Sequence, residues 1–502
     1  MTAPDRTATA AEGRADAPRR TPPVVRLLVL AAFVVILNET IMVNAIPRLM
    51  SSFGVTEASA QWVSTAFMLT MAAVIPVTGW FLQRFSTRRA YATAMGTFLV
   101  GTAIAGLAPT FEVLLLGRIV QAAGTAVMVP LLMTTLMTVV PPHDRGRVMG
   151  NVTLAISVAP ALGPTISGVV LQTGSWRLLF AVVLPIAAFI TWSGLRRLEN
   201  VGESGTDHVD WASVVIAAAG FGGLVYGLTR FAEGEVGLPI AIAGAGLALV
   251  VVFVLRQVQL IRRGSPLLDL RALRHSTFAR GLLLMTIAFM TMLGAMMLLP
   301  LYLQNLRGLS PLQTGLLVMP GGLAMGLLGP TVGRLFDAHG SRPLVIPGTV
   351  GIVAALVGLT QLSLTMPYAV VLALHVLLML SLAFTFTPVF TLSLGVLPAH
   401  LYSHGSSILG TLQQVAAAFG TALAVTVMTV RADAVVAEVG QRAATVSGMR
   451  WAFGVAAAIA LLTVVAAVML PRRVEEVEAP VEPRDPVDPV NAVERLDEPA
   501  GA

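Results

Sequence analysis

The chain has 502 residues, of which 56% are hydrophobic and only 12% charged, and its mean hydropathy is +0.82. A soluble domain carries about 25% charged residues, so this composition excludes an ordinary water-soluble protein and indicates lipid as the solvent. The absence of Cys excludes disulfides, thiolate nucleophiles and thiolate metal sites. Every basic residue is Arg, which also excludes a Schiff-base or phosphate-loop lysine.

The chain begins with a polar segment, residues 1–22, which we interpret as a disordered cytoplasmic tail. It is not a secretory signal, because the apolar run that follows is too long and lacks a small-residue cleavage site. From there we identify fourteen apolar runs long enough to cross a bilayer as helices. The runs cover residues 24–46, 60–82, 90–108, 112–140, 148–171, 177–195, 211–230, 237–260, 281–303, 312–335, 344–364, 367–396, 406–430 and 449–470.

The Arg residues between these runs predict the orientation. With the N-terminus in the cytoplasm, the inner segments hold 24 Arg and the outer loops hold seven, and Arg118 lies inside a span. Such a bias favours a multi-pass protein of the cytoplasmic membrane with both termini inside. It also explains the pI near 10.6 better than a nucleic-acid partner does. The Pro- and Glu-rich segment 471–502 is interpreted as a second disordered tail.

The chain contains an internal repeat. Gly79 and Arg88 recur as Gly333 and Arg342, each 254 residues later, and Pro47 corresponds to Pro300 at an offset of 253. Paired repeats of this kind place a substrate site between the halves near the midplane. We therefore predict an N-terminal six-helix half at 23–200, two inserted helices at 205–262 and a C-terminal six-helix half at 263–470.

The first run carries an acidic residue at depth, within Asn38-Glu39-Thr40. A charge there costs about 2.5–3.5 kcal/mol on insertion scales, which makes Glu39 a candidate functional residue. At 1.5 Å per residue Glu39 lies about 22 Å from the inner surface, and Arg118 of the fourth run lies roughly 20 Å from it. We hypothesise that the two face each other, directly or through water or Gln121, and that Asn38, Glu39 and Arg118 couple proton movement. A static structural ion pair is the alternative.

Two further patterns suggest moving parts. The fifth run contains Pro160, Gly163, Pro164 and Gly168, a combination that bends a membrane helix and permits tight packing. The short loops after the second and tenth runs carry charges that could form a gate that breaks in one state, or could serve only as topology signals. The predicted gating residues of these loops and the next inner loop are Arg84, Arg88, Arg89, Asp144, Asp337 and Arg342.

Polar and adaptable side chains inside the spans are candidates for a substrate pocket. They are Thr40, Asn44, Gln121, Met297, Gln304 and Gln414. Met residues of the ninth run suit bulky and varied ligands, although a Met stripe is also ordinary packing. The sequence shows no metal-ligand spacing, nucleophile elbow or phosphate loop, so no cofactor or metal is predicted.

At these residues the sequence resembles the major facilitator superfamily across nearly all of 24–470. The inner-loop Gly/Arg pattern is similar to the family signature, except that Gln83 stands where Asp is usual while Asp337 keeps it. The Pro160–Gly168 run resembles the signature of exporters that exchange substrate for protons. The chain is also similar to the fourteen-span drug/proton antiporters, most of all the lincomycin-resistance type. The similarity lies in the fourteen runs and in three motifs: Leu37–Thr40, Pro266-Leu267-Leu268-Asp269-Leu270 and Thr411–Val415.

The resemblance implies a two-half, all-α membrane transporter with two extra central helices. We expect a proton-coupled exporter of bulky hydrophobic or cationic compounds that works as a monomer and needs no cofactor, with an adaptor protein as an optional partner. Proton-coupled uptake of a metabolite or peptide is one alternative, and a non-transporting sensor or scaffold is another. An enzyme is the least favoured class.

Overall fold

The computed structural model describes residues 21–42, 45–172, 174–201, 209–233 and 237–473, so the predicted pocket residue Asn44 and most of both predicted tails lie outside it. The described residues form helices and no strand. The first group comprises α2 (Pro23–Ile41), α3 (Ile46–Phe53), α4 (Glu57–Arg84), α5 (Thr87–Gly106), α6 (Phe111–Val139), η2 (Pro142–Asp144), α7 (Arg145–Gln172) and α8 (Arg177–Arg197).

A helical hairpin and a second group of helices follow. The hairpin consists of α9 (Trp211–Ala232) and α10 (Leu238–Arg263). The second group comprises η3 (Leu270–Arg274), α11 (Ser276–Leu301), η4 (Tyr302–Leu306), α12 (Pro311–His339), α13 (Arg342–Leu359), α14 (Tyr368–Gly395), η5 (Ala399–Leu401), α15 (Tyr402–Val439) and α16 (Gln441–Met469).

Thirteen helices of the described residues are long and apolar enough to cross a membrane. Each of the fourteen predicted runs coincides with a long helix, but α5 is not among the thirteen. It begins with Thr87, Arg88 and Arg89 and contains several Gly and Thr residues, which lower its hydropathy. An all-α membrane protein is therefore confirmed, whereas the count of fourteen spans stays a prediction.

The first predicted run is wrong in its extent, because α2 ends at Ile41 and a separate α3 begins at Ile46. Pro47 lies in the first turn of α3, where its missing N–H is tolerated, whereas inside a continuous helix it would remove a hydrogen bond. The corresponding Pro300 lies inside α11, which leads directly into the π-helix η4. The two related prolines thus have different surroundings: one lies in the first turn of a new helix, and the other lies inside a continuous helix that is followed by a π-helix.

The two helix groups repeat one packing scheme. In the first group α2 packs on α6, α7 and α8, α4 packs on α6, and α5 packs on α6 and α8. In the second group α11 packs on α14, α15 and α16, α12 packs on α14, and α13 packs on α14 and α16. Helix by helix, the second set corresponds to the first, as the repeat predicts. The residue limits of the halves stay predictions.

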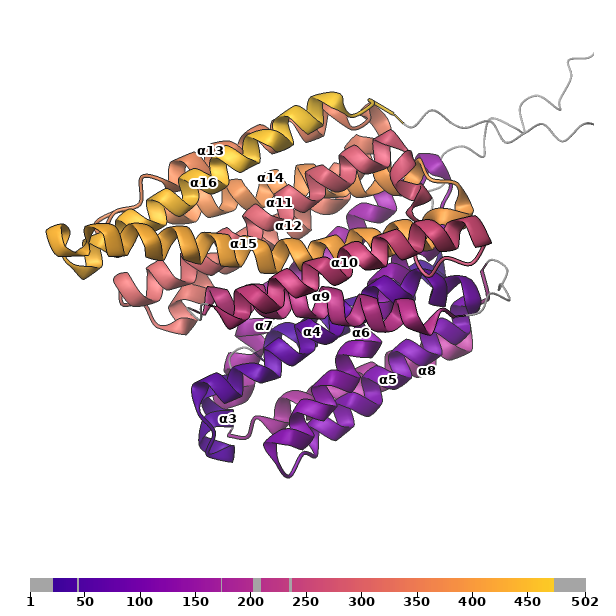
Figure 1. Ribbon diagram of the computed structural model, residues 1–502, viewed down its shortest axis with the longest axis horizontal. Coiled ribbons are helices and arrows are strands. Elements are labelled where there is room, and N and C mark those ends of the chain that lie inside the picture. The colour runs from indigo at the N-terminus through magenta and orange to yellow at the C-terminus, as the bar shows by residue number, and fades with distance from the viewer. Residues whose placement is uncertain (1–20, 43–44, 173, 202–208, 234–236, 474–502) are drawn as a thin grey trace, which may run out of the picture.

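Two main seams join the groups, α7 against α12 and α4 against α15, and contacts of α6 with α15 and of α7 with α14 add to them. The α9–α10 hairpin packs on itself, and α9 also contacts α4 and α15. In Figure 1 the hairpin crosses the front of the molecule between α4 below and α15 above. It is therefore an attachment at one seam rather than a spacer between the groups.

One end of the bundle, here called the Arg-rich end, gathers the ends of α4, α8, α10, α12 and α16 and the starts of α5, α7, α11, α13 and α15. Arg342 at the start of α13 donates from Nε to the Leu470 carbonyl at the end of α16, at 2.7 Å. Ser341 donates from Oγ to the Pro471 carbonyl at 2.6 Å, so the predicted C-terminal tail is ordered where it begins.

The seam between α7 and α12 is closed by glycines. A Cβ on Gly150 would lie 2.7 Å from the Pro330 Cα, and a Cβ on Gly329 would lie 2.6 Å from the Gly150 carbonyl oxygen. Gly146 and Gly333 meet in the same way one turn nearer the Arg-rich end. Small residues at such spacing let two membrane helices pack backbone against backbone.

Candidate functional site

The buried cation Arg118 is the centre of the site. Its side chain on α6 is only 1% exposed. The Nη1 atom donates to Gln121 Oε1 at 2.6 Å and to Asn38 Oδ1 at 3.1 Å, and Nε donates to the Val63 carbonyl at 3.4 Å. The guanidinium lies 4.2 Å from the centroid of the Phe67 ring. Arg118 therefore joins α6 to α2 and α4 inside the first group.

The partners of Arg118 are fixed in turn. Gln121 is fully buried, and its Nε2 donates to Thr102 Oγ1 on α5 at 2.7 Å. Thr102 donates to the Phe98 carbonyl at 2.6 Å. A Cβ on Gly117 would lie 2.6 Å from the Ala105 nitrogen, so this glycine lets α5 approach α6 closely. The chain of hydrogen bonds holds the guanidinium in one place.

Glu39 lies beside this network on α2, half-buried. Within the described part of the chain its carboxylate forms no ion pair and accepts no hydrogen bond, although Arg118 acts on it electrostatically. Contact between α2 and α6 is made through Asn38 rather than through a direct Glu39–Arg118 ion pair. Asn38 Nδ2 is buried and has no partner among the described residues, so a donor is available one residue from the acid.

The fifth predicted run reaches the same place from α7. A Cβ on Gly163 would lie 2.8 Å from the Thr40 Cβ, so the glycine admits α2 next to Glu39. Thr40 donates from Oγ1 to the Leu37 carbonyl at 3.0 Å, within its own helix. The Pro160–Gly168 region runs inside the continuous helix α7. It therefore packs against the acidic stretch rather than standing apart from it.

The other predicted pocket residues are spread over the second group. Met297 is 40% exposed on α11, and Gln304 and Gln414 are half-buried on η4 and α15. Within the described residues, no hydrogen bond joins them to Thr40 or Gln121. Sequence reasoning missed an open groove of about 380 Å³ between α4 and α9. Its lining residues gave no signal in the sequence: Leu69, Thr70, Ala73, Ala218, Gly222, Gly223 and Tyr226.

The carboxylate of Asp337 accepts hydrogen bonds that join the two groups at the Arg-rich end. Its Oδ1 accepts from the Gly146 N–H at 2.8 Å and its Oδ2 accepts from the Arg147 N–H at 2.7 Å. Both donors lie in the first turn of α7, where unpaired N–H groups and the helix dipole favour an anion. The end of α12 is thereby fastened to the start of α7, and we call this contact the Asp337 latch.

Gln83, the residue at the related position of the first repeat, makes a different bond. Its Nε2 donates to the His400 carbonyl at 2.6 Å, just before α15 begins. We call this contact the Gln83 latch. Both latches connect the groups at the Arg-rich end, but only one of them uses a charge.

The other predicted gating charges are placed differently from expectation. Asp144 lies 3.7 Å from Arg147 and 3.6 Å from His143, and among the described residues it forms no ion pair with Arg88 or Arg89. The side chains of Arg88 and Arg89 are exposed, while Arg84 lies over the Phe85 ring. Because α5 begins at Thr87, the next two Arg side chains lie on its exposed side in this structure, and a gating role for them stays a prediction. Within the described residues, no cluster of His, Cys, Asp or Glu could hold a metal ion.

Comparison with known proteins identifies the family. The model of the Major Facilitator Superfamily matches residues 28–421. The chain belongs to the major facilitator superfamily. A relative named lincomycin resistance protein LmrB, from Listeria monocytogenes, is 37% identical over 409 residues, which cover 81% of this chain and 86% of that protein. The protein of the same name from Bacillus subtilis is 35% identical, covering 90% and 96% of the two chains.

A solved structure supports the fold. The human organic anion transporter MFSD10 superposes with a TM-score of 0.65 at 15% identity, covering 89% of this chain and all of that one. At such low identity the likeness concerns the fold alone. The expected major-facilitator-like architecture is thus confirmed, and the protein is a multi-pass membrane transporter.

Proposed function

We propose that this transporter is a proton-driven exporter of drugs and similar bulky hydrophobic or cationic compounds. The names of its relatives support the substrate class, since proteins more than 30% identical over most of the chain are called lincomycin resistance proteins. The single observation that carries proton coupling is the placement of Arg118. This cation is fully buried, it donates hydrogen bonds to Gln121 and Asn38, and Asn38 directly precedes the membrane-embedded acid Glu39.

Glu39 would carry the proton. Its charged form is attracted to Arg118 across the α2–α6 contact, and its protonated form is not. The cation keeps its hydrogen bonds to Asn38 and Gln121 in either case, so protonation of Glu39 removes a counter-charge without breaking these two bonds. Proton binding would therefore change the force between α2 and α6 without dismantling the site. That change is what a rocking transporter needs to bias two states.

The Arg-rich end would face the cytoplasm, in keeping with the bias of Arg toward inner loops. Both latches are formed at this end, and with this orientation they would belong to a state closed toward the cytoplasm. Proton entry from outside and substrate capture from inside would then occur in alternate states. A functional monomer, with or without an adaptor protein, stays a prediction.

Everted membrane vesicles test direction and coupling together. When the vesicle interior is more acidic than the medium, wild-type vesicles should accumulate lincomycin or a fluorescent lipophilic cation. Glu39→Gln should abolish this accumulation and keep exchange of labelled for unlabelled substrate without a gradient, because Gln keeps the shape but binds no proton. Glu112→Gln, at an exposed acid in the first turn of α6, is the matched control.

Three results would overturn parts of the proposal. Full gradient-driven accumulation by Glu39→Gln would refute the role of Glu39. Accumulation only in right-side-out vesicles would indicate uptake by symport instead. A protein that moves no compound in either orientation would act as a sensor or scaffold.

A further inference from the structure

The connection between α10 and α11 is inserted into the bundle, although it carries no spanning helix. Residues 266–271 contain Leu267, Leu268 and Asp269, which are only 1%, 4% and 2% exposed. An ordinary connection lies on the surface, because buried backbone would lose its hydrogen bonds to water. This segment, here called the wedge, must therefore have its polar groups satisfied by the protein.

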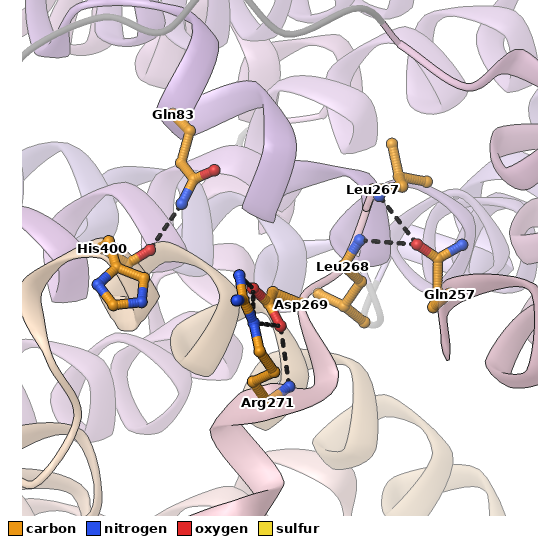
Figure 2. A network of polar contacts seen from close by, with 7 residues as sticks. All are labelled: Gln83, Gln257, Leu267, Leu268, Asp269, Arg271 and His400. Atoms are coloured by element: carbon orange, nitrogen blue, oxygen red, sulfur yellow. Dashed lines mark hydrogen bonds and ion pairs between the residues drawn. The ribbon is translucent and has the colours of Figure 1, made fainter. Parts of the chain in front are cut away.

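Gln257 of α10 satisfies the wedge backbone. Its Oε1 accepts from the Leu267 N–H at 2.9 Å and from the Leu268 N–H at 3.1 Å, as Figure 2 shows. Its Nε2 donates to Ser213 Oγ on α9 at 2.8 Å, and Gln257 is fully buried. One side chain thus joins both helices of the hairpin to the wedge.

The hairpin end of this connection is itself fixed. Ser213 donates from Oγ to Asp210 Oδ2 at 2.5 Å. Asp210 also accepts two hydrogen bonds from Arg256, at 2.7 and 2.9 Å. These Arg256 bonds lower the pKa of Asp210 to about 2, so its carboxylate stays charged at neutral pH. The amide of Gln257 is therefore anchored on a rigid base.

The far side of the wedge touches the α4–α15 seam. A Cβ on Gly79 of α4 would lie 3.3 Å from Leu268 Cδ1, 3.4 Å from the His404 Cα and 2.6 Å from His404 Nδ1. Leu268 thus lies against Gly79 of α4, which in turn faces His404 of α15, and η3, which begins inside the wedge, contacts α15. Gln83, one turn further along α4, donates to His400 at the start of α15. The wedge lies beside the Gln83 latch, and Figure 2 shows the two together.

Asp269 places a charge at this seam. Its carboxylate accepts from Arg271 Nε at 2.9 Å and Nη2 at 2.6 Å, and also from the Arg271 N–H at 2.9 Å. Burial raises the pKa of Asp269, but the hydrogen bonds from Arg271 and the nearby positive charges together lower it by more. The pKa of this carboxyl group is therefore below its usual value. The carboxylate is compensated within the wedge, so it does not pull on either helix directly.

We propose that Gln257 is a positioning residue for transport, because it holds the wedge against α4 and α15 and so makes the inserted α9–α10 hairpin a part of the gate at the Arg-rich end. The inference rests on the proposed transport function. Opening this end separates α4 from α15, and the wedge must then lose its contact with one of these two helices. The wedge supplies closing force at the seam whose latch lacks a carboxylate.

The test uses accessibility and does not depend on substrate or proton coupling. Because the natural chain has no Cys, Leu268→Cys provides a single label site. In membranes, a maleimide applied to the Arg-rich end should react about tenfold faster when Gln257→Leu is added, since two buried hydrogen bonds are lost. Gln259→Leu, the same change at an exposed position two residues away, should leave the rate unchanged.

Transport kinetics separate positioning from folding. Gln257→Leu should lower the maximal transport rate about tenfold with little change in KM, whereas Gln259→Leu should leave both unchanged. Unchanged labelling and unchanged rate in folded Gln257→Leu would overturn the proposal. Failure of wild-type vesicles to accumulate any compound would refute the proposed function and leave the labelling result intact.

If Gln257→Leu does not reach the membrane, a cross-link gives the answer in the intact chain. A short bifunctional maleimide between Leu268→Cys and His404→Cys should stop transport in proportion to the cross-linked fraction. Each single Cys variant, treated in the same way, is the control. Full transport by completely cross-linked protein would overturn the proposal.

Discussion

The two latches at the Arg-rich end occupy related positions and work by different forces. The Asp337 latch sets a carboxylate on two N–H groups at the start of α7, where the helix dipole strengthens the bonds. The Gln83 latch is one neutral hydrogen bond to a carbonyl. The α7–α12 seam also has the glycine contacts, whereas the α4–α15 seam has the wedge. The α7–α12 seam is therefore held by a charge and by backbone packing. The α4–α15 seam is held by neutral hydrogen bonds, including one from Ser407 Oγ to the Ile75 carbonyl at 2.6 Å, together with the wedge.

Preventing backbone contact at the stronger seam should have the largest effect. Gly150→Ala places a methyl group against the backbone of Gly329 and Pro330, which cannot move aside as a side chain could. We expect loss of transport, measured as accumulation in vesicles, with normal amounts of protein in the membrane. Gly96→Ala, where no atom lies within 4 Å of the added carbon, is the control. Equal transport by both variants would show that the seam tolerates separation.

Removing the charge from the Asp337 latch should have the next largest effect. Asp337→Asn keeps one acceptor oxygen but presents an N–H₂ group to a backbone N–H, so one charge-assisted bond is lost. Such a bond contributes about 1.5–3 kcal/mol, which predicts a fall in transport rate of roughly tenfold or more. Asp433→Asn, an exposed acid on α15, is the control. A rate near that of wild type would mean that glycine packing alone holds this seam.

Removing the Gln83 latch should have the smallest effect. Gln83→Leu loses one neutral hydrogen bond at a partly exposed site, and we expect the transport rate to fall about two- to fivefold. Combined with Gln257→Leu, the loss should exceed the product of the single effects if the wedge and the latch hold one seam. Simple multiplication of the two losses would indicate that they act separately.

The residue types of this site were predictable, and their connections were not. A membrane carboxylate and a membrane Arg at similar depth follow from apolar runs and helix rise, because these depend on local sequence. Whether Glu39 or its neighbour Asn38 reaches Arg118 depends on the rotation of α2, which packing against α7 at Gly163 decides. The gating charges show the same limit, since Asp337 forms a bond between the groups whereas Arg88 points outward.

The wedge contains a motif that the sequence revealed, but its role in the structure could not be predicted from the motif. The run from Pro266 to Leu270 stood out in the sequence as similar to a group of transporters, but nothing in its letters placed it at a seam. Its position depends on Gln257, which lies ten residues before Leu267 and carries no charge to draw notice. Polar contacts between separate elements are set by three-dimensional neighbours, and a neutral amide gives little sign of them beforehand.

The sequence by itself determined the solvent, the helices, the repeat and the family, because hydrophobic length, Arg bias and recurring motifs are properties of the chain read in order. The tertiary structure decided which seam is latched by charge, how the hairpin joins the gate and which residue holds Arg118. Those outcomes depend on helix rotation and on close approach at a few glycines. Both are fixed only when all the helices pack together.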